Sequence, residues 1–235
     1  MINNTTLQLK IKQRLNKLDS HDYDNIQPWQ MVEAFNKAQL QWCRRQIEGI
    51  NITKAADEQS TTKVDDLQVI LKTQRLDTFV QPLFEDSPLP EDYMAFKRVD
   101  AYAMKDCCVN DQHINVTYLA EEENISILLD DYLKKPSFEW GETFCTLIAN
   151  RLRIYTGGEF KLKNVDFIYY RTPRKIQIAG TTDPYTLQVS TEDVICEFKD
   201  DIAEIMIDDA VQILAGDMES VFQYQVAQAS SQTNT

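Results

Sequence analysis

The sequence predicts an α+β protein in which N- and C-terminal helices form a helical bundle with an inserted antiparallel β-rich module. Helical periodicity fills most of the first 50 residues, β-branched and aromatic residues gather in the middle, and helical periodicity returns after Asp200. We therefore divide the chain into N-terminal helices of the bundle (1–75), a β-rich inserted module with a short helix (76–190), the C-terminal helix of the bundle (191–229) and a flexible tail (230–235).

The N-terminal part predicts two well-marked helices and a short third one. The first runs from Thr5 to Leu18, with an apolar line at every third or fourth position. The second begins near Pro28, because proline suits the first helical position, and continues to about Ile50. Residues 64–71 predict the third.

The second helix has more apolar surface than a solitary helix hides. Its polar residues form one narrow stripe, while apolar residues cover most of the remaining circumference. These apolar residues are Trp29, Met31, Val32, Phe35, Ala38, Leu40, Trp42, Cys43 and Ile47. We expect part of this face to be covered by other helices of the same chain and the remainder by another subunit.

The middle of the chain predicts strands joined by short turns. We expect strands at 96–104 and 109–119, a helix at 121–133, and strands at 144–155, 160–170 and 175–179. Paired glycines at 157–158 predict a hairpin turn, so the last three strands form an antiparallel meander. A change of apolar phase predicts a β-bulge near Lys163-Asn164. The final helix is expected from Asp200 to about Ala227.

Composition limits the classes of protein that the chain belongs to. Hydrophobic residues make up 43% of the 235, which is enough for a core, and no apolar run approaches the roughly 20 residues of a membrane span. The N-terminus is polar, so we expect a soluble protein made in a cytoplasm. The net charge of −13 argues against a sequence-reading nucleic-acid binder. The five cysteines lack a C-x-x-C spacing and are interpreted as buried free thiols.

Few residues have a pattern typical of catalysis. The two histidines, His21 and His113, belong to no metal-binding motif, and no phosphate-binding glycine loop is present. Adjacent aspartates, as in Asp208-Asp209, point about 100° apart on a helix and do not converge on one ion. We therefore expect a non-enzymatic protein without a metal or cofactor, whose function resides in its surface. The alternatives are a soluble monomeric binding module and a metal-dependent phage enzyme that uses the acidic pairs.

Several segments resemble the head–tail connector (ring, or adaptor) proteins of tailed bacteriophages, most closely those of crAss-like short-tailed phages. The resemblance covers Asn25 to about Met218 and is carried by short motifs in a characteristic order. They are Asn25-Ile-Gln-Pro-Trp, Glu33-Ala-Phe-Asn-Lys-Ala-Gln-Leu, Arg44-Arg45, Ser87-Pro-Leu-Pro-Glu-Asp-Tyr, Pro136-Ser-Phe-Glu-Trp-Gly-Glu-Thr-Phe, Tyr169-Tyr-Arg-Thr-Pro and Ile213-Leu-Ala-Gly-Asp.

The resemblance implies a structural virion protein in the neck or tail region, assembled in the bacterial host cytoplasm. Its copies are expected to form a homo-oligomeric, dodecameric ring between the portal protein and the next tail or ring protein. The ring would surround the channel through which viral DNA passes without sequence-specific binding. No catalytic residue, cofactor or membrane is implied. The alternative structural role is another neck or tail component, such as a tail hub or a minor capsid-bound protein.

Aromatic residues are the first interface candidates, because buried aromatic side chains often anchor subunit contacts. They are Trp29, Phe35, Trp42 and Trp140. The alternative for each is a place in the core of its own chain.

Charged residues are the second set, because the first helix is basic and the last is acidic. Opposite charges suit head-to-tail pairing of copies, and the alternative is two solvated helix faces. The candidate interface residues are Lys10, Lys12 and Arg14. An acidic wall gives DNA no place to bind, so the candidate channel-facing residues are Glu204, Asp208 and Glu219.

Overall fold

The computed structural model describes residues 2–16, 26–48, 65–105, 111–182, 184, 187–217 and 228–229. The chain divides into two compact units. Unit 1 combines Met1–Ile70 with Thr172–Thr235, and unit 2 is Leu71–Arg171. Each unit is described by itself below. None of the described helices is long and apolar enough to cross a membrane.

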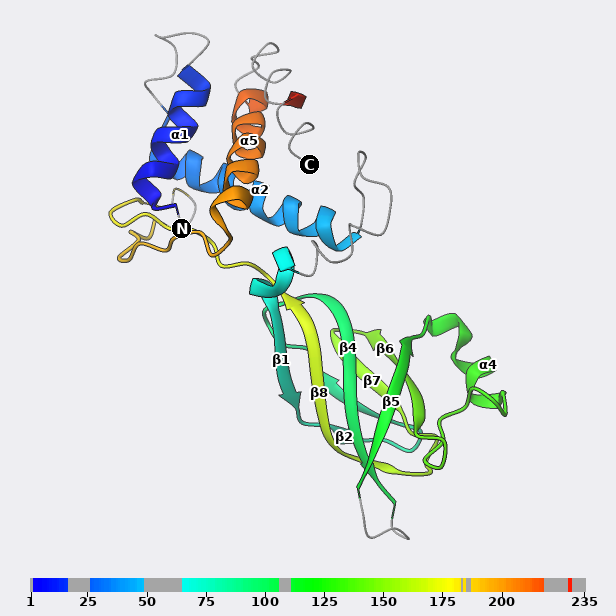
Figure 1. Ribbon diagram of the computed structural model, residues 1–235. Helices are drawn as coiled ribbons and strands as arrows, with labels where there is room; N and C mark the ends of the chain where they lie inside the picture. Colours follow the sequence, from blue (N-terminus) through cyan, green and yellow to red (C-terminus); the bar gives the residue numbers. More distant parts are fainter. Residues whose placement is uncertain are drawn as a thin grey trace. The chain divides into compact units, whose positions relative to one another are not determined.

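Unit 1 contains the helices α1 (Asn4–Asn16), α2 (Pro28–Glu48) and α5 (Asp200–Asp217), with a 3-10 turn, η1 (Gln68–Ile70) (Figure 1). The predicted starts of all three helices agree with the structure to within one residue. Helix α5 contacts both α1 and α2. Burial of Leu7, Ile11 and Leu15 confirms the apolar line of α1 as far as the described residues reach.

None of the described residues of 172–199 belongs to a regular strand, and the backbone at Arg174 and Ile176 contacts side-chain amides of α2. The Asn36 amide accepts a hydrogen bond from the Ile176 N–H at 2.8 Å and donates one to the Ile176 carbonyl at 3.3 Å. Gln39 donates to the Arg174 carbonyl at 3.2 Å. The predicted strand 175–179 is therefore wrong, because the Asn36 amide pairs with both backbone groups of Ile176 and only an isolated bridge joins Gln177 to Val194.

Unit 2 is an eight-stranded sheet with the order β1-β8-β4-β5-β6-β7-β3-β2. Its strands are β1 (Leu71–Leu76), β2 (Phe79–Val80), β3 (Phe84–Pro88), β4 (Tyr93–Met104), β5 (Gln112–Leu119), β6 (Glu142–Ile148), β7 (Arg151–Tyr155) and β8 (Lys161–Arg171). Between β5 and β6 the chain forms η2 (Glu122–Asn124) and α4 (Ile125–Asp130). Strands β5 and β6 are parallel, and the other neighbouring pairs are antiparallel.

The sheet is curled (Figure 1). Its two edge strands, β1 and β2, are separated by only Asp77 and Thr78, a connection that spans at most about 11 Å. The buried Glu85 on β3 accepts hydrogen bonds from the Thr78 hydroxyl at 2.6 Å and from the Leu162 N–H on β8 at 2.7 Å. One carboxylate thus links strands from opposite ends of the strand order.

Two apolar clusters hold unit 2 together. The larger joins residues of six strands, including Ile114, Val165 and Phe167, with Phe138 and Phe160 from the connecting loops. The smaller lies beneath α4, where Ile125 and Leu128 pack with Phe144 and Tyr155. The aromatic rings of the latter pair are stacked with centroids 4.9 Å apart.

The predicted fold class is wrong. The described residues are dominated by the curled eight-stranded sheet with only a few helices, rather than by a helical bundle with an inserted antiparallel module. The error has a physical source in β1 and β3, whose sequences Leu71-Lys-Thr-Gln-Arg-Leu and Phe84-Glu-Asp-Ser-Pro lack a strand-like apolar alternation. Both are strands because of pairing with residues about 60 to 100 positions away.

The predicted meander is also wrong. Ala149 and Asn150, both at positive φ, form the turn that splits the expected strand 144–155 into the β6–β7 hairpin. Strand β7 then pairs with β6 and β3, whereas β8 pairs with β1 and β4, so the glycine turn joins strands that are not neighbours. The bulge is confirmed, because Tyr102 lies opposite Asn164 while the next residue lies opposite Leu162.

Candidate functional site

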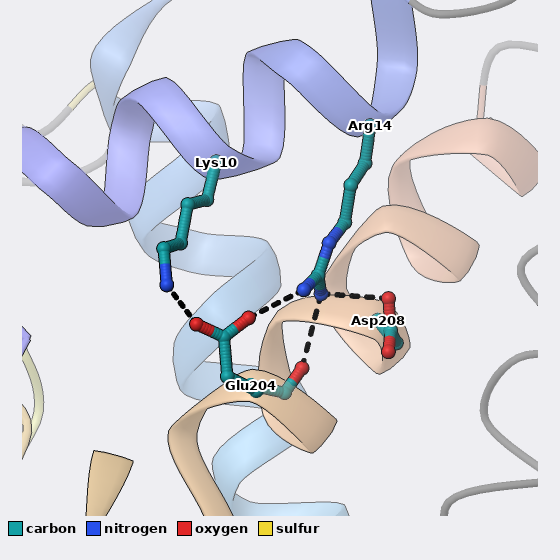
Figure 2. A network of polar contacts seen from close by, with 4 residues as sticks. All are labelled: Lys10, Arg14, Glu204 and Asp208. Atoms are coloured by element: carbon teal, nitrogen blue, oxygen red, sulfur yellow. Dashed lines mark hydrogen bonds and ion pairs between the residues drawn. The ribbon is translucent and has the colours of Figure 1, made fainter. Parts of the chain in front are cut away.

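Basic residues of α1 and acidic residues of α5 form one network of ion pairs (Figure 2). Lys10 and Arg14 lie one turn apart on α1, and Glu204 and Asp208 lie one turn apart on α5. Glu204 accepts from both cations. Arg14 Nη1 also donates to the Asp208 carboxylate at 2.6 Å and to the Glu204 carbonyl at 3.1 Å. The spacing matches because residues at i and i+4 share a helix face.

The opposite charges at the two ends of the chain therefore meet within one subunit at these four residues. Lys12 lies about 200° around α1 from Lys10. It is exposed and forms no ion pair with any residue in the described ranges. Glu219 lies outside the described residues. Roles for Lys10, Lys12 and Arg14 in subunit contacts stay predictions. The same holds for roles of Glu204, Asp208 and Glu219 along a channel.

The two carboxylates of the Asp208-Asp209 pair do not converge on a common point. Asp208 contacts Arg14 on α1, whereas the adjacent Asp209, which is buried, forms an ion pair with Arg45 on α2. Among the described residues no group of three histidine, cysteine, aspartate or glutamate side chains is arranged to hold a metal ion. His113 is exposed and packs edge-on against Tyr102, with centroids 5.2 Å apart, and His21 lies outside the described residues.

The four aromatic candidates occupy different environments. Phe35 and Trp42 are buried in unit 1, where Trp42 packs edge-on against Phe198 with centroids 5.4 Å apart. Trp29 is half-buried, and Trp140 is 72% exposed. The expectation that the chain covers part of the apolar face of α2 is thus confirmed. Cover of the remainder by another subunit stays a prediction.

A surface depression in unit 2 surrounds Trp140, and we call it the Trp140 hollow. Tyr132 and Leu133, 78% and 77% exposed, line it with Trp140 and with Glu139, Glu142 and Glu159. Lys105 and Lys135 complete the charged lining. The Lys135 ammonium lies 5.5 Å from the centroid of the Tyr132 ring. This set of exposed aromatic faces and carboxylates is suited to contact with a cationic partner.

A second depression runs along α2 in unit 1, and we call it the α2 groove. Trp29, Val32 and Leu40 follow one another along the helix as its half-buried apolar wall. The opposite wall comes from 175–190 and contains Ile176 and Ile178, and Glu33, Lys37 and Lys175 provide the charged lining. The groove therefore combines apolar walls with charged lining residues whose net charge is positive.

Sequence reasoning missed two groups of exposed apolar residues. Phe79 and Val80 on the edge strand β2 are 56% and 61% exposed, and Leu83 follows in the adjacent turn. The sequence predicts Tyr132 and Leu133 only as the end of the helix 121–133, whereas both are exposed. The sequence signal for both groups is an apolar pair at the end of an element. Phe79 and Val80 stand beside a proline-containing loop, and Tyr132 and Leu133 stand at the end of the predicted helix. Loops and element ends lie at the surface, where the chain covers apolar side chains least.

The shifted pKa of Asp92 in unit 2 arises in a partly exposed hydrogen-bond cluster with Lys72 and Tyr169. Tyr169 donates to Asp92 at 2.6 Å, and Lys72 donates to the same carboxylate at 2.7 Å. Burial raises the pKa of Asp92, but the hydrogen bonds from Lys72 and Tyr169 outweigh it, so its pKa lies below the ordinary value. Burial also raises the pKa of the Cys145 thiol to about 12, which keeps it protonated and unreactive at neutral pH.

A comparison of the sequence with protein-family models found no match, and a comparison with curated proteins found none either.

Proposed function

We propose that this chain is a structural virion protein that forms a head–tail connector ring between the portal and the next tail component. Copies of the chain would surround the DNA channel in the virion neck, and the motifs from Asn25 onward suggest this setting. The protein would act by holding neighbours in place, without catalysis and without a cofactor.

The observation that carries the proposal is the presence of two unlike surfaces on one chain. The Trp140 hollow in unit 2 exposes large aromatic side chains and carboxylates. The α2 groove in unit 1 offers apolar side chains and two lysines. A cyclic ring needs two different, complementary patches on every subunit, because each copy contacts its two neighbours through opposite sides. Exposed tryptophan and tyrosine are also the residue types that dominate the energetics of interfaces.

The overall charge agrees with this role. A net charge of −13 disfavours binding of DNA, since affinity for a duplex depends on cations that release its counterions. A ring through which DNA passes benefits from a surface that does not retain it.

The proposal is tested by native mass spectrometry and negative-stain imaging of the purified chain, alone and with the portal protein. We expect closed rings in at least one of these conditions. A chain that stays monomeric in both contradicts the ring and favours a monomeric binding module. Open or irregular oligomers that bind the portal would instead indicate another neck or tail component.

A further inference from the structure

The Trp140 hollow and the α2 groove each contain charged side chains that form no ion pair with the described residues. Glu139 and Glu142 in the hollow form no ion pair with any residue that the structure describes. The same holds, within the described ranges, for Lys37 and Lys175 in the groove. By contrast, many other charged side chains are paired within the chain, as in the contacts of Arg14.

The unpaired charges have opposite signs in the two places. The groove is lined by two lysines and one glutamate, which makes it locally cationic on a chain whose net charge is −13. The hollow is lined by three glutamates and two lysines, and Lys135 lies 4.0 Å from Glu159. Complementary charge of this kind steers association and determines which surfaces meet.

The apolar parts of the two surfaces also match. The Lys135 ammonium already lies over the Tyr132 ring, whereas no cation of the described residues lies over the Trp140 ring. An incoming lysine can therefore stack on Trp140 while Glu139 takes up its charge. Leu133 and Tyr132 then face apolar side chains such as Val32 and Leu40.

We propose that the Trp140 hollow of one copy receives the rim of the α2 groove of a second copy of this chain, with Lys175 and Lys37 against Glu139, Glu142 and Trp140. This inference rests on the proposed ring and specifies its subunit contact. Each copy presents its hollow to one neighbour and its groove to the other, which is a heterologous contact.

The size of the two depressions indicates what part of the contact they form. The hollow is lined by ten residues and the groove by thirteen. Stable interfaces bury about 20–30 residues on each side, so these surfaces would form the centre of a larger contact. Because aromatic residues at an interface centre carry much of the binding energy, Trp140→Ala should weaken one contact by at least about tenfold.

The experiment uses two complementary variants of the full chain. The hollow variant carries Trp140→Ala with Glu139→Gln, and the groove variant carries Lys37→Glu with Lys175→Glu, so the two altered surfaces do not regain opposite charges. All four residues are exposed, so circular dichroism and melting should match the wild type. Matched controls change exposed residues elsewhere, as Phe79→Ala with Glu192→Gln for the hollow and Lys97→Glu with Lys161→Glu for the groove.

We expect each variant alone to lose the rings in native mass spectrometry, while the controls keep them. An equimolar mixture of the two variants should form dimers but no closed ring. The intact groove of one variant can bind the intact hollow of the other, and the remaining two surfaces are both altered. Dimers in the mixture and monomers in the separate samples are the specific sign of this contact.

Several results would overturn the inference. Rings from either variant at the wild-type level would mean that the altered surface is not the subunit contact. A mixture that stays monomeric would mean that the two surfaces do not bind each other. In both cases wild-type rings would leave the proposed function standing, whereas a monomeric wild type, with and without the portal, would refute both proposals.

Discussion

At the scale of single residues, Arg14 on α1 makes polar contacts with two acidic residues of α5. Its guanidinium joins Glu204 and Asp208, and all three side chains are partly shielded from water. We predict that Arg14→Ala lowers the free energy of unfolding by about 1–2 kcal/mol, between the values for exposed and buried pairs. Urea unfolding followed by the fluorescence of tryptophan measures this change.

Lys12→Ala is the matched control for that measurement. Lys12 is on the same helix but exposed, so its removal should change stability by less than about 0.5 kcal/mol. Equal effects of the two substitutions would contradict a stabilising role for the network. Arg14→Lys should fall between them, because an ammonium cannot reproduce the two-pronged contact of the guanidinium.

The Asp92 cluster predicts how the stability of unit 2 depends on pH. The pKa of Asp92 lies below its unfolded value, because the hydrogen bonds from Lys72 and Tyr169 outweigh burial. A carboxylate of this kind contributes stability above its unfolded pKa of about 3.9, and the contribution is lost as pH falls through the folded pKa. The stability advantage of wild type over Asp92→Asn should be constant from about pH 5 to about pH 7 and shrink below about pH 4.

Chemical unfolding of both proteins over this range measures the difference. An advantage that grows on acidification would contradict the assigned direction of the shift. Asp166→Asn is a useful comparison, because Asp166 pairs with the more exposed Arg75 on the same strand pair. Its effect should be smaller, since solvent screens an exposed pair.

At the scale of elements, Glu85 links the two ends of the curled sheet. Glu85→Leu would leave the Leu162 N–H without its acceptor and the Thr78 hydroxyl without its partner. An unsatisfied buried donor costs about 1–3 kcal/mol, so we expect a loss of stability in that range. The midpoint of urea unfolding, monitored by far-UV circular dichroism, reports the change.

Glu85→Gln and Glu91→Leu complete that experiment. Glutamine keeps one carbonyl oxygen as an acceptor and should cost less than leucine. Glu91 is exposed in the loop before β4, so Glu91→Leu should be close to neutral. If Glu85→Leu were as mild as Glu91→Leu, the carboxylate would not stabilise the closure of the sheet.

At the scale of the whole molecule, the acidic charge predicts weak interaction with DNA. With 37 acidic and 24 basic residues, the chain has little capacity to replace the counterions of a duplex. We predict no retardation of a linear duplex in an electrophoretic mobility assay at physiological salt. Stable complexes under these conditions would contradict a channel surface that DNA passes without binding.

The helices of unit 1 were predictable from the sequence because their information is local. Pro28 marks the start of α2, and Leu7, Ile11 and Leu15 recur at the helical period. The bulge beside Lys163 was also visible, since the apolar phase of one strand changes there. The surfaces of the helices were less predictable, because periodicity shows that Trp29 and Trp42 are apolar but not which one the chain covers.

Only the tertiary structure decided the sheet and the surfaces. The strand identity of Leu71–Leu76 and Phe84–Pro88 depends on partners far along the chain, and the glycine turn at 157–158 looks like a hairpin until those partners are known. The pairing of Lys10 and Arg14 with Glu204 and Asp208 likewise joins residues about 190 positions apart. The sequence by itself determined composition, charge and local periodicity, whereas the tertiary structure determined which charges and aromatic rings remain exposed. The physical reason is that burial and ion pairing depend on contacts between distant segments, which no local pattern encodes.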